Sequence, residues 1–189
     1  MAKLVLASTS VYRQELLSRL QLPFDIFPPN VDETPEAGEL PAQTAERLSL
    51  SKALAAVAHH HDSLIIGSDQ VAYLGNSVFG KPGNVATAMK QLLAMSGQDV
   101  IFHTGLSLVN SKTGEHQTRG IATHVGFREL SADEIRRYLT KEDALNCAGS
   151  AKSEALGISL LRYIRGDDPN ALVGLPLVAL CEMLRNEGI

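Results

Sequence analysis

Short runs of hydrophobic residues recur along the whole chain, separated by polar segments that are rich in glycine and proline. The runs at residues 3–7, 24–27 and 64–66 have the length and composition of buried or half-buried strands. Residues 13–20 and 41–57 instead place apolar side chains at helical spacing, and the second of these segments opens on a proline, which suits the first position of a helix. The first third of the chain therefore predicts alternating strands and helices.

Longer β-rich runs follow in the second half of the chain. Residues 71–79 predict a β-hairpin that turns at Gly75-Asn76, and residues 100–109 and 121–130 predict two antiparallel strands joined by a polar turn. The remaining predicted elements are a strand over residues 158–164 and helices over residues 86–95, 131–140 and 177–184.

This order of elements predicts the α/β class, with a mixed, partly antiparallel sheet and flanking helices. The chain has 189 residues, of which 44% are hydrophobic, so it can bury a sizeable core. Because no repeat or linker interrupts the chain, residues 1–189 are predicted to form a single domain. This domain could be divided into two lobes around a central cleft.

Charge and composition exclude several classes of function. The net charge of −4 argues against sequence-independent binding of nucleic acid, which needs a basic surface. No apolar run approaches the ~18 residues of a membrane span, and the apolar patch at the amino terminus is too short for a signal peptide. Cys147 and Cys181 show no CxxC spacing and are expected to be reduced, partly buried thiols. A cytoplasmic protein is expected.

Two polar segments that directly follow predicted strands are candidate sites. Ser8 and Ser10, with Arg13 after them, combine hydroxyls, helix-terminal amides and a guanidinium, which suits an anion; a simple helix cap is the alternative. Asp69, in the segment Gly67-Ser68-Asp69-Gln70, follows a buried strand and could coordinate a metal or abstract a proton; a turn-stabilising role is the alternative.

Three lysines, each beside serine or glycine, add a diffuse third candidate. Together with nearby carboxylates they could hold a polyphosphate and its Mg²⁺, although the chain lacks the GxxxxGK[ST] motif of P-loop enzymes. The lysines are Lys52, Lys81 and Lys152, and the carboxylates are Asp32, Glu33 and Asp69. His59-His60-His61 looks like a metal tract, but adjacent residues splay around a helix, so metal binding there is disfavoured.

Six motifs occur in the order and spacing of the Maf family of nucleotide pyrophosphatases, and the resemblance spans almost the whole chain. The motifs are Leu6-Ala7-Ser8-Thr9-Ser10 with Arg13, Val31-Asp32-Glu33-Thr34, Lys52-Ala53, Gly67-Ser68-Asp69-Gln70, Gly80-Lys81-Pro82 and Val173-Gly174-Leu175-Pro176. Gln70 and the segment Cys147–Glu154 resemble the branch of the family that acts on 7-methyl-GTP, whereas the branch for dTTP and UTP typically has threonine in place of Gln70.

The resemblance implies a two-lobed α/β fold, a nucleotide substrate, a homodimer, and hydrolysis of the α–β anhydride with Mg²⁺ or Mn²⁺. Asp69 would be the base or a metal ligand, and Glu33 would share the metal. The implied phosphate contacts are Ser8, Ser10, Arg13, Lys52, Lys81 and Lys152, and the implied base-reading residues are Tyr12, Gln70 and Glu154. The alternatives are a nucleotide-binding regulator of cell division without turnover, a pyrophosphatase for dTTP or UTP, and a phosphatase that removes the terminal phosphate.

Overall fold

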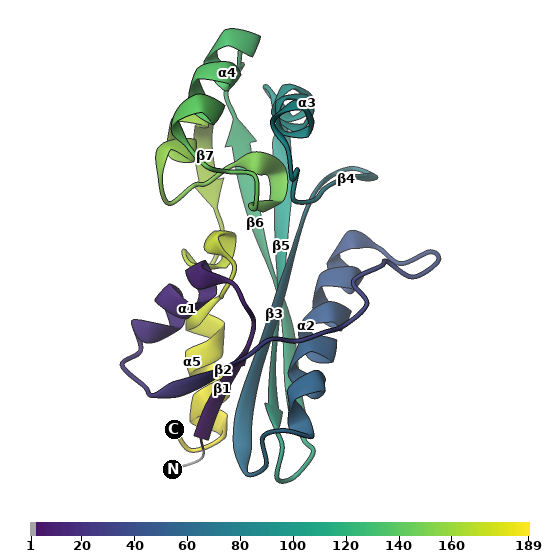
Figure 1. Ribbon diagram of the computed structural model, residues 1–189, viewed down its shortest axis with the longest axis vertical. Helices are drawn as coiled ribbons and strands as arrows, with labels where there is room; N and C mark the ends of the chain where they lie inside the picture. The colour runs from purple at the N-terminus through teal and green to yellow at the C-terminus, as the bar shows by residue number, and fades with distance from the viewer. Residues whose placement is uncertain (1–2) are drawn as a thin grey trace. The chain divides into compact units, whose positions relative to one another are not determined.

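The computed structural model describes residues 3–189 and has the predicted α/β architecture (Figure 1). Within these residues one mixed sheet contains seven strands in the order β2-β1-β3-β5-β6-β7, with β4 paired to β3. The strands are β1 (Lys3–Ala7), β2 (Phe24–Phe27), β3 (Ser63–Leu74), β4 (Ser77–Phe79), β5 (Asp99–Asn110), β6 (His116–Phe127) and β7 (Leu161–Arg165). The α-helices are α1 (Val11–Ser18), α2 (Pro41–Val57), α3 (Val85–Met95), α4 (Ala132–Lys141) and α5 (Leu177–Asn186). The 3₁₀-helices are η1 (Ala148–Ser150), η2 (Leu156–Leu160) and η3 (Ala171–Val173).

The chain divides into two compact units. The first unit contains the residues up to Gln70, His103–Ile121 and Asp168–Ile189, and the second contains Val71–Phe102 and Ala122–Asp167. Strands β3, β5 and β6 each contribute residues to both units. The expectation of a single domain over residues 1–189, with a cleft between lobes, stays a prediction.

Parallel strands form the core of the first unit. β1 pairs in parallel with both β2 and β3, and because side chains alternate along a strand, its two faces pack against different helices. Leu4 and Leu6 belong to an apolar cluster with α1 and α5, whereas Val5 and Ala7 belong to a cluster with α2. Figure 1 accordingly shows α2 on one side of these strands and α1 and α5 on the other. Burial on both faces explains why these strands read as continuous apolar runs.

The second unit is built from antiparallel pairs and two helices. β3 and β4 form the predicted hairpin around Gly75-Asn76, and β6 pairs with β7 antiparallel. Helix α4 begins at the predicted capping box, in which Ser131 and Glu134 each accept a hydrogen bond from the other's backbone N–H. The helices α3 and α4 pack against each other and complete this unit.

Several boundaries differ from the prediction. The strand predicted over residues 64–66 does not end at the Gly67–Gln70 segment but continues as β3 to Leu74, so Asp69 lies within a strand and not in a loop. The strand predicted over residues 158–164 begins only at Leu161, since the 3₁₀-helix η2 occupies the residues before it. The first helix ends at Ser18, before the predicted Leu20.

The helices and the two cysteines bear on the expectations about membrane spans and thiols. Every helix within residues 3–189 is too short or too polar to cross a lipid bilayer. Cys147 and Cys181 are both partly buried thiols, as expected from the sequence.

Candidate functional site

The centre of the candidate site is the ammonium group of Lys52, which contacts two carboxylates in the first unit. Its Nζ lies 2.5 Å from an oxygen of Asp69 and 2.7 Å from an oxygen of Glu33. Lys52 comes from α2, Asp69 from β3, and Glu33 from the loop between β2 and α2. The structure therefore brings together three predicted residues that are far apart in the sequence.

Gly67 explains how α2 and β3 come close enough for this contact. A Cβ at this position would overlap the carbonyl oxygen of Ser49 and would lie 2.8 Å from the backbone nitrogen of Ala53, so only glycine lets the helix backbone approach the strand. Gly67 and Asp69 are two residues apart and share a face of the strand, and Lys52 directly precedes Ala53. The glycine of the Gly67–Gln70 motif thus places the lysine beside the aspartate.

The contact between Lys52 and Asp69 is a buried ion pair. Lys52 is 6% exposed and Asp69 is 8% exposed, whereas the side chain of Glu33 is 60% exposed. Burial of a charge is costly unless the charge is paired, and here each buried charge has an opposite partner. Glu33 is the member of the trio that faces solvent.

Arg13, on α1, is a second cation of the first unit. Its Nε donates to the carbonyl oxygen of Gly174 at 2.8 Å, and one terminal nitrogen donates to Ser8 Oγ at 3.4 Å. Burial lowers the pKa of the Arg13 guanidinium, and the negative charges of Asp69 and Glu33 act in the opposite direction. Arg13 is therefore coupled electrostatically to the same carboxylates that Lys52 contacts.

The two serines of the first motif hold the start of α1. Ser10 is the N-cap, since its hydroxyl accepts from the backbone N–H of Arg13 at 3.4 Å, and Ser8 Oγ accepts from the N–H of Ser10 at 3.1 Å. Tyr12 is half-buried in the first turn of the same helix. The helix cap predicted as the alternative to an anion contact is thus present, and a phosphate contact by either serine stays a prediction.

Gln70 uses its amide nitrogen within the protein. Nε2 lies 3.0 Å from the hydroxyl of Thr104 and 3.0 Å from the carbonyl oxygens of Ala171 and Leu172. Carbonyl oxygens only accept hydrogen bonds, so the nitrogen of the amide must face them. Any effect of Gln70 on substrate selection therefore has to involve the turn that contains Ala171 and Leu172 or the amide oxygen.

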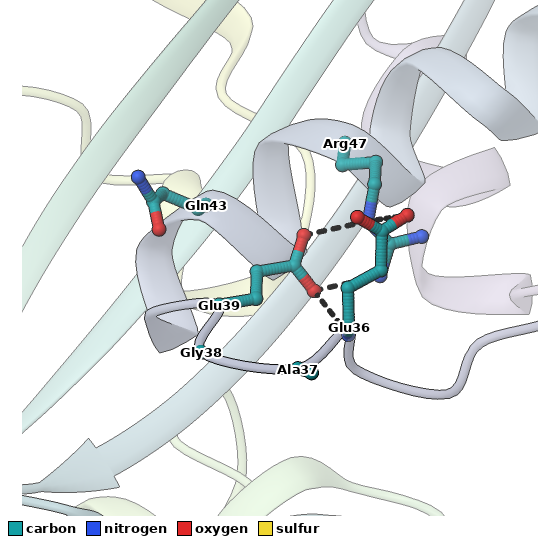
Figure 2. Close-up of a pocket in the computed structure, with 6 residues that line it drawn as sticks. All are labelled: Glu36, Ala37, Gly38, Glu39, Gln43 and Arg47. Carbon is teal, nitrogen blue, oxygen red and sulfur yellow. Dashed lines mark hydrogen bonds and ion pairs between the residues drawn. The ribbon is translucent and has the colours of Figure 1, made fainter.

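The loop that carries Glu33 is fastened to α2 by Arg47 (Figure 2). Arg47 donates to both carboxylate oxygens of Glu39, at 2.6 and 2.8 Å, and to the carbonyl oxygen of Thr34 at 3.2 Å. Hydrogen bonds from Arg47 hold the pKa of Glu39 down at about 2. Two cations of one helix, Arg47 and Lys52, thus hold the same acidic loop.

Lys152, in the second unit, is held by a network of its own. Its ammonium lies 3.1 Å from Glu142, whose other oxygen accepts from the backbone N–H of Leu156 at 3.0 Å. The backbone N–H of Lys152 donates to the hydroxyl of Tyr138, and burial raises the pKa of Tyr138 to about 12. The segment is tight, because a Cβ on Gly157 would lie 2.5 Å from the carbonyl oxygen of Lys152.

Lys81 and Glu154, the other predicted residues of the second unit, are exposed. The loops that carry Lys81 and Lys152 share a support on α3, since Gln91 donates to the carbonyl oxygen of Gly80 and accepts from Ser150 Oγ. Each unit therefore contains part of the predicted set: Glu154 lies in the second unit, while Tyr12 and Gln70 lie in the first.

Metal binding at the candidate site depends on the donor groups that the structure provides. Within residues 3–189 no group of three or more histidine, cysteine, aspartate or glutamate side chains could hold an ion. Mg²⁺, however, is commonly bound by one or two carboxylates with water and substrate phosphates, and Glu33 and Asp69 form such a pair on one ammonium. His59 and His60 pack against the ring of Phe27.

Sequence reasoning missed the residues that support the site. Asp32 was predicted only as one of the carboxylates near the lysines, whereas in the structure it accepts from the N–H of Thr34 and shapes the loop. Arg47, Thr104 and Glu142 lie in no motif, so only the three-dimensional contacts identify them. Asp168 also lies in no motif; it is buried, and its carboxylate accepts from the backbone N–H groups of Asn170 and Val178.

Comparison with known proteins matches residues 3–187 to the family described as Maf-like protein. A 7-methyl-GTP pyrophosphatase of Aromatoleum aromaticum is 59% identical over 188 residues, which cover 100% of this chain and 97% of the relative. Proteins with the same name from Thiobacillus denitrificans and Cupriavidus metallidurans are 56% and 54% identical, over 98% of this chain and 92% and 93% of their own lengths. The chain belongs to the Maf-like protein family.

Proposed function

We propose that this protein hydrolyses 7-methyl-GTP at its α–β anhydride and releases the nucleoside monophosphate and pyrophosphate. The observation that carries the proposal is full-length similarity, at more than half of all positions, to relatives named 7-methyl-GTP pyrophosphatase. The contacts of Lys52 with Asp69 and Glu33 support it, because they provide the carboxylates and the cation that such a reaction needs.

Arg13 and Lys52 are the proposed phosphate-binding cations of the first unit, with Ser8 and Ser10 as hydroxyl donors. The negative charges of Asp69 and Glu33 already balance these two cations. A nucleoside triphosphate is strongly anionic, so productive binding needs additional positive charge. This charge balance supports a requirement for a divalent cation.

Glu33 and Asp69 are the proposed ligands of Mg²⁺ or Mn²⁺. When bound, such an ion neutralises phosphate charge and makes a bound water more acidic. Full activity in the presence of excess EDTA would overturn this proposal. The basic side chains alone would then have to neutralise the charge of the phosphates.

Asp69 is proposed to orient the attacking water, to accept its proton or to do both. The oxygen of the water forms a bond to the α-phosphorus, and the bond from that phosphorus to the bridging oxygen breaks, so pyrophosphate leaves with the bonding electrons. Lys52 fixes the direction of the Asp69 carboxylate through their 2.5 Å contact, which restricts where a water can be held.

Tyr12, Gln70 and Glu154 are the proposed determinants of base selection. Methylation at N7 makes guanine cationic, so an aromatic face such as Tyr12 and a carboxylate such as Glu154 both favour it. The amide nitrogen of Gln70 is engaged within the protein, so we assign Gln70 an effect through its neighbours. Roles for Lys81 and Lys152 in phosphate binding stay predictions from the sequence.

We further propose that the protein works in the cytoplasm as a homodimer, and that the small nucleotide is its partner. The two cysteines lack CxxC spacing and are partly buried, which is consistent with a reducing compartment.

A panel of nucleotides tests the substrate. We expect kcat/KM to be higher for 7-methyl-GTP than for GTP, dTTP or UTP, in the presence of Mg²⁺. A preference for dTTP and UTP would move the protein to the other branch of the family. Binding of all four nucleotides without turnover would favour a regulator.

A further inference from the structure

The turn between Asp168 and the start of α5 supplies backbone acceptors to side chains of the proposed site. The carbonyl oxygen of Gly174 accepts from Arg13 Nε at 2.8 Å and from Ser68 Oγ at 2.9 Å. Gly174 has φ +117°, which side chains rarely allow, and a Cβ there would lie 3.4 Å from Arg13 Nε. The backbone of this turn therefore faces Arg13 directly.

The middle of the turn is held from β3 and β5. Gln70 donates to the carbonyl oxygens of Ala171 and Leu172, and the hydroxyl of Thr104 donates to Ala171 at 2.9 Å. Thr104 also accepts from Gln70, so the two side chains and the Ala171 carbonyl oxygen form a closed set of hydrogen bonds. Thr104 is fully buried, which excludes water as a competing partner.

Asp168 anchors the turn to the N-terminus of α5. Its side chain is buried, with the residue 4% exposed, and its carboxylate accepts from the backbone N–H groups of Asn170 at 3.0 Å and Val178 at 2.7 Å. The N-cap residue of α5, Pro176, provides no side-chain cap, so the carboxylate of Asp168 satisfies this helix end instead. One oxygen thus holds the turn and the other holds the helix that follows it.

We infer that Asp168 is a positioning residue for Arg13, acting through the backbone of residues 170–174. The Nε bond to Gly174 fixes the plane of the guanidinium, and a planar group binds phosphate oxygens well only in a restricted orientation. Asp168 itself does not touch the substrate. The inference rests on the proposed function of Arg13 in binding phosphate.

The test is a double-mutant cycle that joins Asp168→Asn with Arg13→Lys. Asparagine has one acceptor oxygen and places an NH₂ against a backbone N–H, so it cannot hold the turn and the helix together. Lysine keeps the charge at position 13 but loses the fixed guanidinium plane. We measure kcat/KM for 7-methyl-GTP, and the affinity for inorganic tripolyphosphate by calorimetry as a readout that does not need turnover.

We expect Asp168→Asn alone to lower kcat/KM by about 10- to 100-fold, the order that misplacement of a binding group produces. In the Arg13→Lys background the same substitution should have little further effect on kcat/KM or on tripolyphosphate affinity. The loss of thermal stability, in contrast, should be equal in both backgrounds. A purely structural role of Asp168 predicts additive effects on all three quantities.

Two further variants keep the inference testable. Asp167→Asn makes the same chemical change at the exposed neighbour and should leave kcat/KM unchanged. If Asp168→Asn does not fold, Thr104→Val takes its place in the cycle. This nearly isosteric substitution loosens the turn from its other side and should show the same coupling to Arg13→Lys.

The outcomes separate the inference from the proposed function. If Arg13→Lys changes neither activity nor tripolyphosphate affinity, the assignment of Arg13 fails and the inference fails with it. If Arg13→Lys has an effect but Asp168→Asn is silent or additive, the inference alone is overturned. If the wild type releases no pyrophosphate but the tripolyphosphate cycle is coupled, the inference stands and the proposed reaction fails.

Discussion

Lys52 holds two carboxylates that come from different parts of the chain, and its burial makes this arrangement rigid. The residue is 6% exposed, so its charge depends on Asp69 and Glu33 for compensation. Removing one partner of a buried pair usually costs more than the pair contributes, because the remaining charge is left without compensation. When Asp69 is neutralised, Glu33 should still compensate the charge of Lys52, so we expect the fold to tolerate this substitution.

Asp69→Asn tests the proposed chemical role of this carboxylate. The substitution keeps the shape and removes the charge, so turnover of 7-methyl-GTP should fall by at least ~10²-fold, the lower range for a positioned base. The far-ultraviolet circular dichroism should be preserved. Asp62→Asn, at an exposed position, is the matched control and should retain full activity. Turnover of the Asp69 variant within threefold of the wild type would refute the assignment.

Glu154→Gln tests whether this exposed carboxylate reads the base. Loss of its charge should reduce the preference for 7-methyl-GTP over GTP by about 5- to 150-fold, or ~1–3 kcal/mol for a charge-assisted hydrogen bond. The ratio of the two kcat/KM values is the quantity to measure, with Glu129→Gln as a control elsewhere in the same unit. An unchanged ratio would show that Glu154 does not contact the base.

At this scale the sequence singled out three residues that the structure brings together, and it missed the residues that support them. Asp69, Lys52 and Glu33 could be singled out because acidic and basic residues beside small ones are unusual next to apolar runs. Gln70 was predicted to read the base, but its amide nitrogen faces Ala171 and Leu172, a contact across about a hundred residues that no local pattern encodes.

The elements show a similar division between local and distant causes. The hairpin at Gly75-Asn76 and the capping box at Ser131 depend on neighbouring residues, so the sequence was sufficient to predict them. The predicted end of β3 was wrong because a glycine such as Gly67 resembles a strand terminator. In the structure Gly67 instead lets the backbone of α2 approach the strand. The 3₁₀-helix η2 was missed, since its apolar residues are also compatible with a strand.

Arg47→Leu should release the loop that carries Glu33 from α2. The variant loses the bonds to Glu39 and to the carbonyl oxygen of Thr34, so the amides of residues 34–39 should exchange hydrogen faster. Hydrogen–deuterium exchange with mass spectrometry measures this directly. Arg136→Leu, which removes an exposed ion pair on α4, is the control. Equal exchange in both variants and the wild type would contradict the proposed fastening.

The same contact should give the loop a defined response to acid. The pKa of Glu39 is depressed to about 2, so its stabilising contribution is present at pH values above the ordinary value of 4.5. It is lost as the pH falls through about 2. Exchange in residues 34–39, compared at matched intrinsic rates, should therefore rise between pH 4 and pH 2 in the wild type and show no such rise in Glu39→Gln. Identical profiles would argue against the Glu39–Arg47 bond.

Across the whole molecule, both units contain residues that the sequence resemblance marks as functional. The first unit contains Asp69 with its cationic and acidic partners, and the second contains Lys81, Lys152 and Glu154. The class of fold was predictable because alternating apolar runs and helical spacing extend along the chain. The residues at which one unit passes into the other were not predictable, since β3, β5 and β6 belong to both units and no linker marks a boundary.

The central claim is that this protein cleaves 7-methyl-GTP between its α- and β-phosphates. Product analysis by ion-exchange chromatography, with no auxiliary phosphatase, tests this claim most directly. The account predicts that 7-methyl-GMP and pyrophosphate appear in equal amounts, without orthophosphate. Release of orthophosphate with 7-methyl-GDP, or recovery of intact nucleotide in the presence of Mg²⁺ and Mn²⁺, would contradict it.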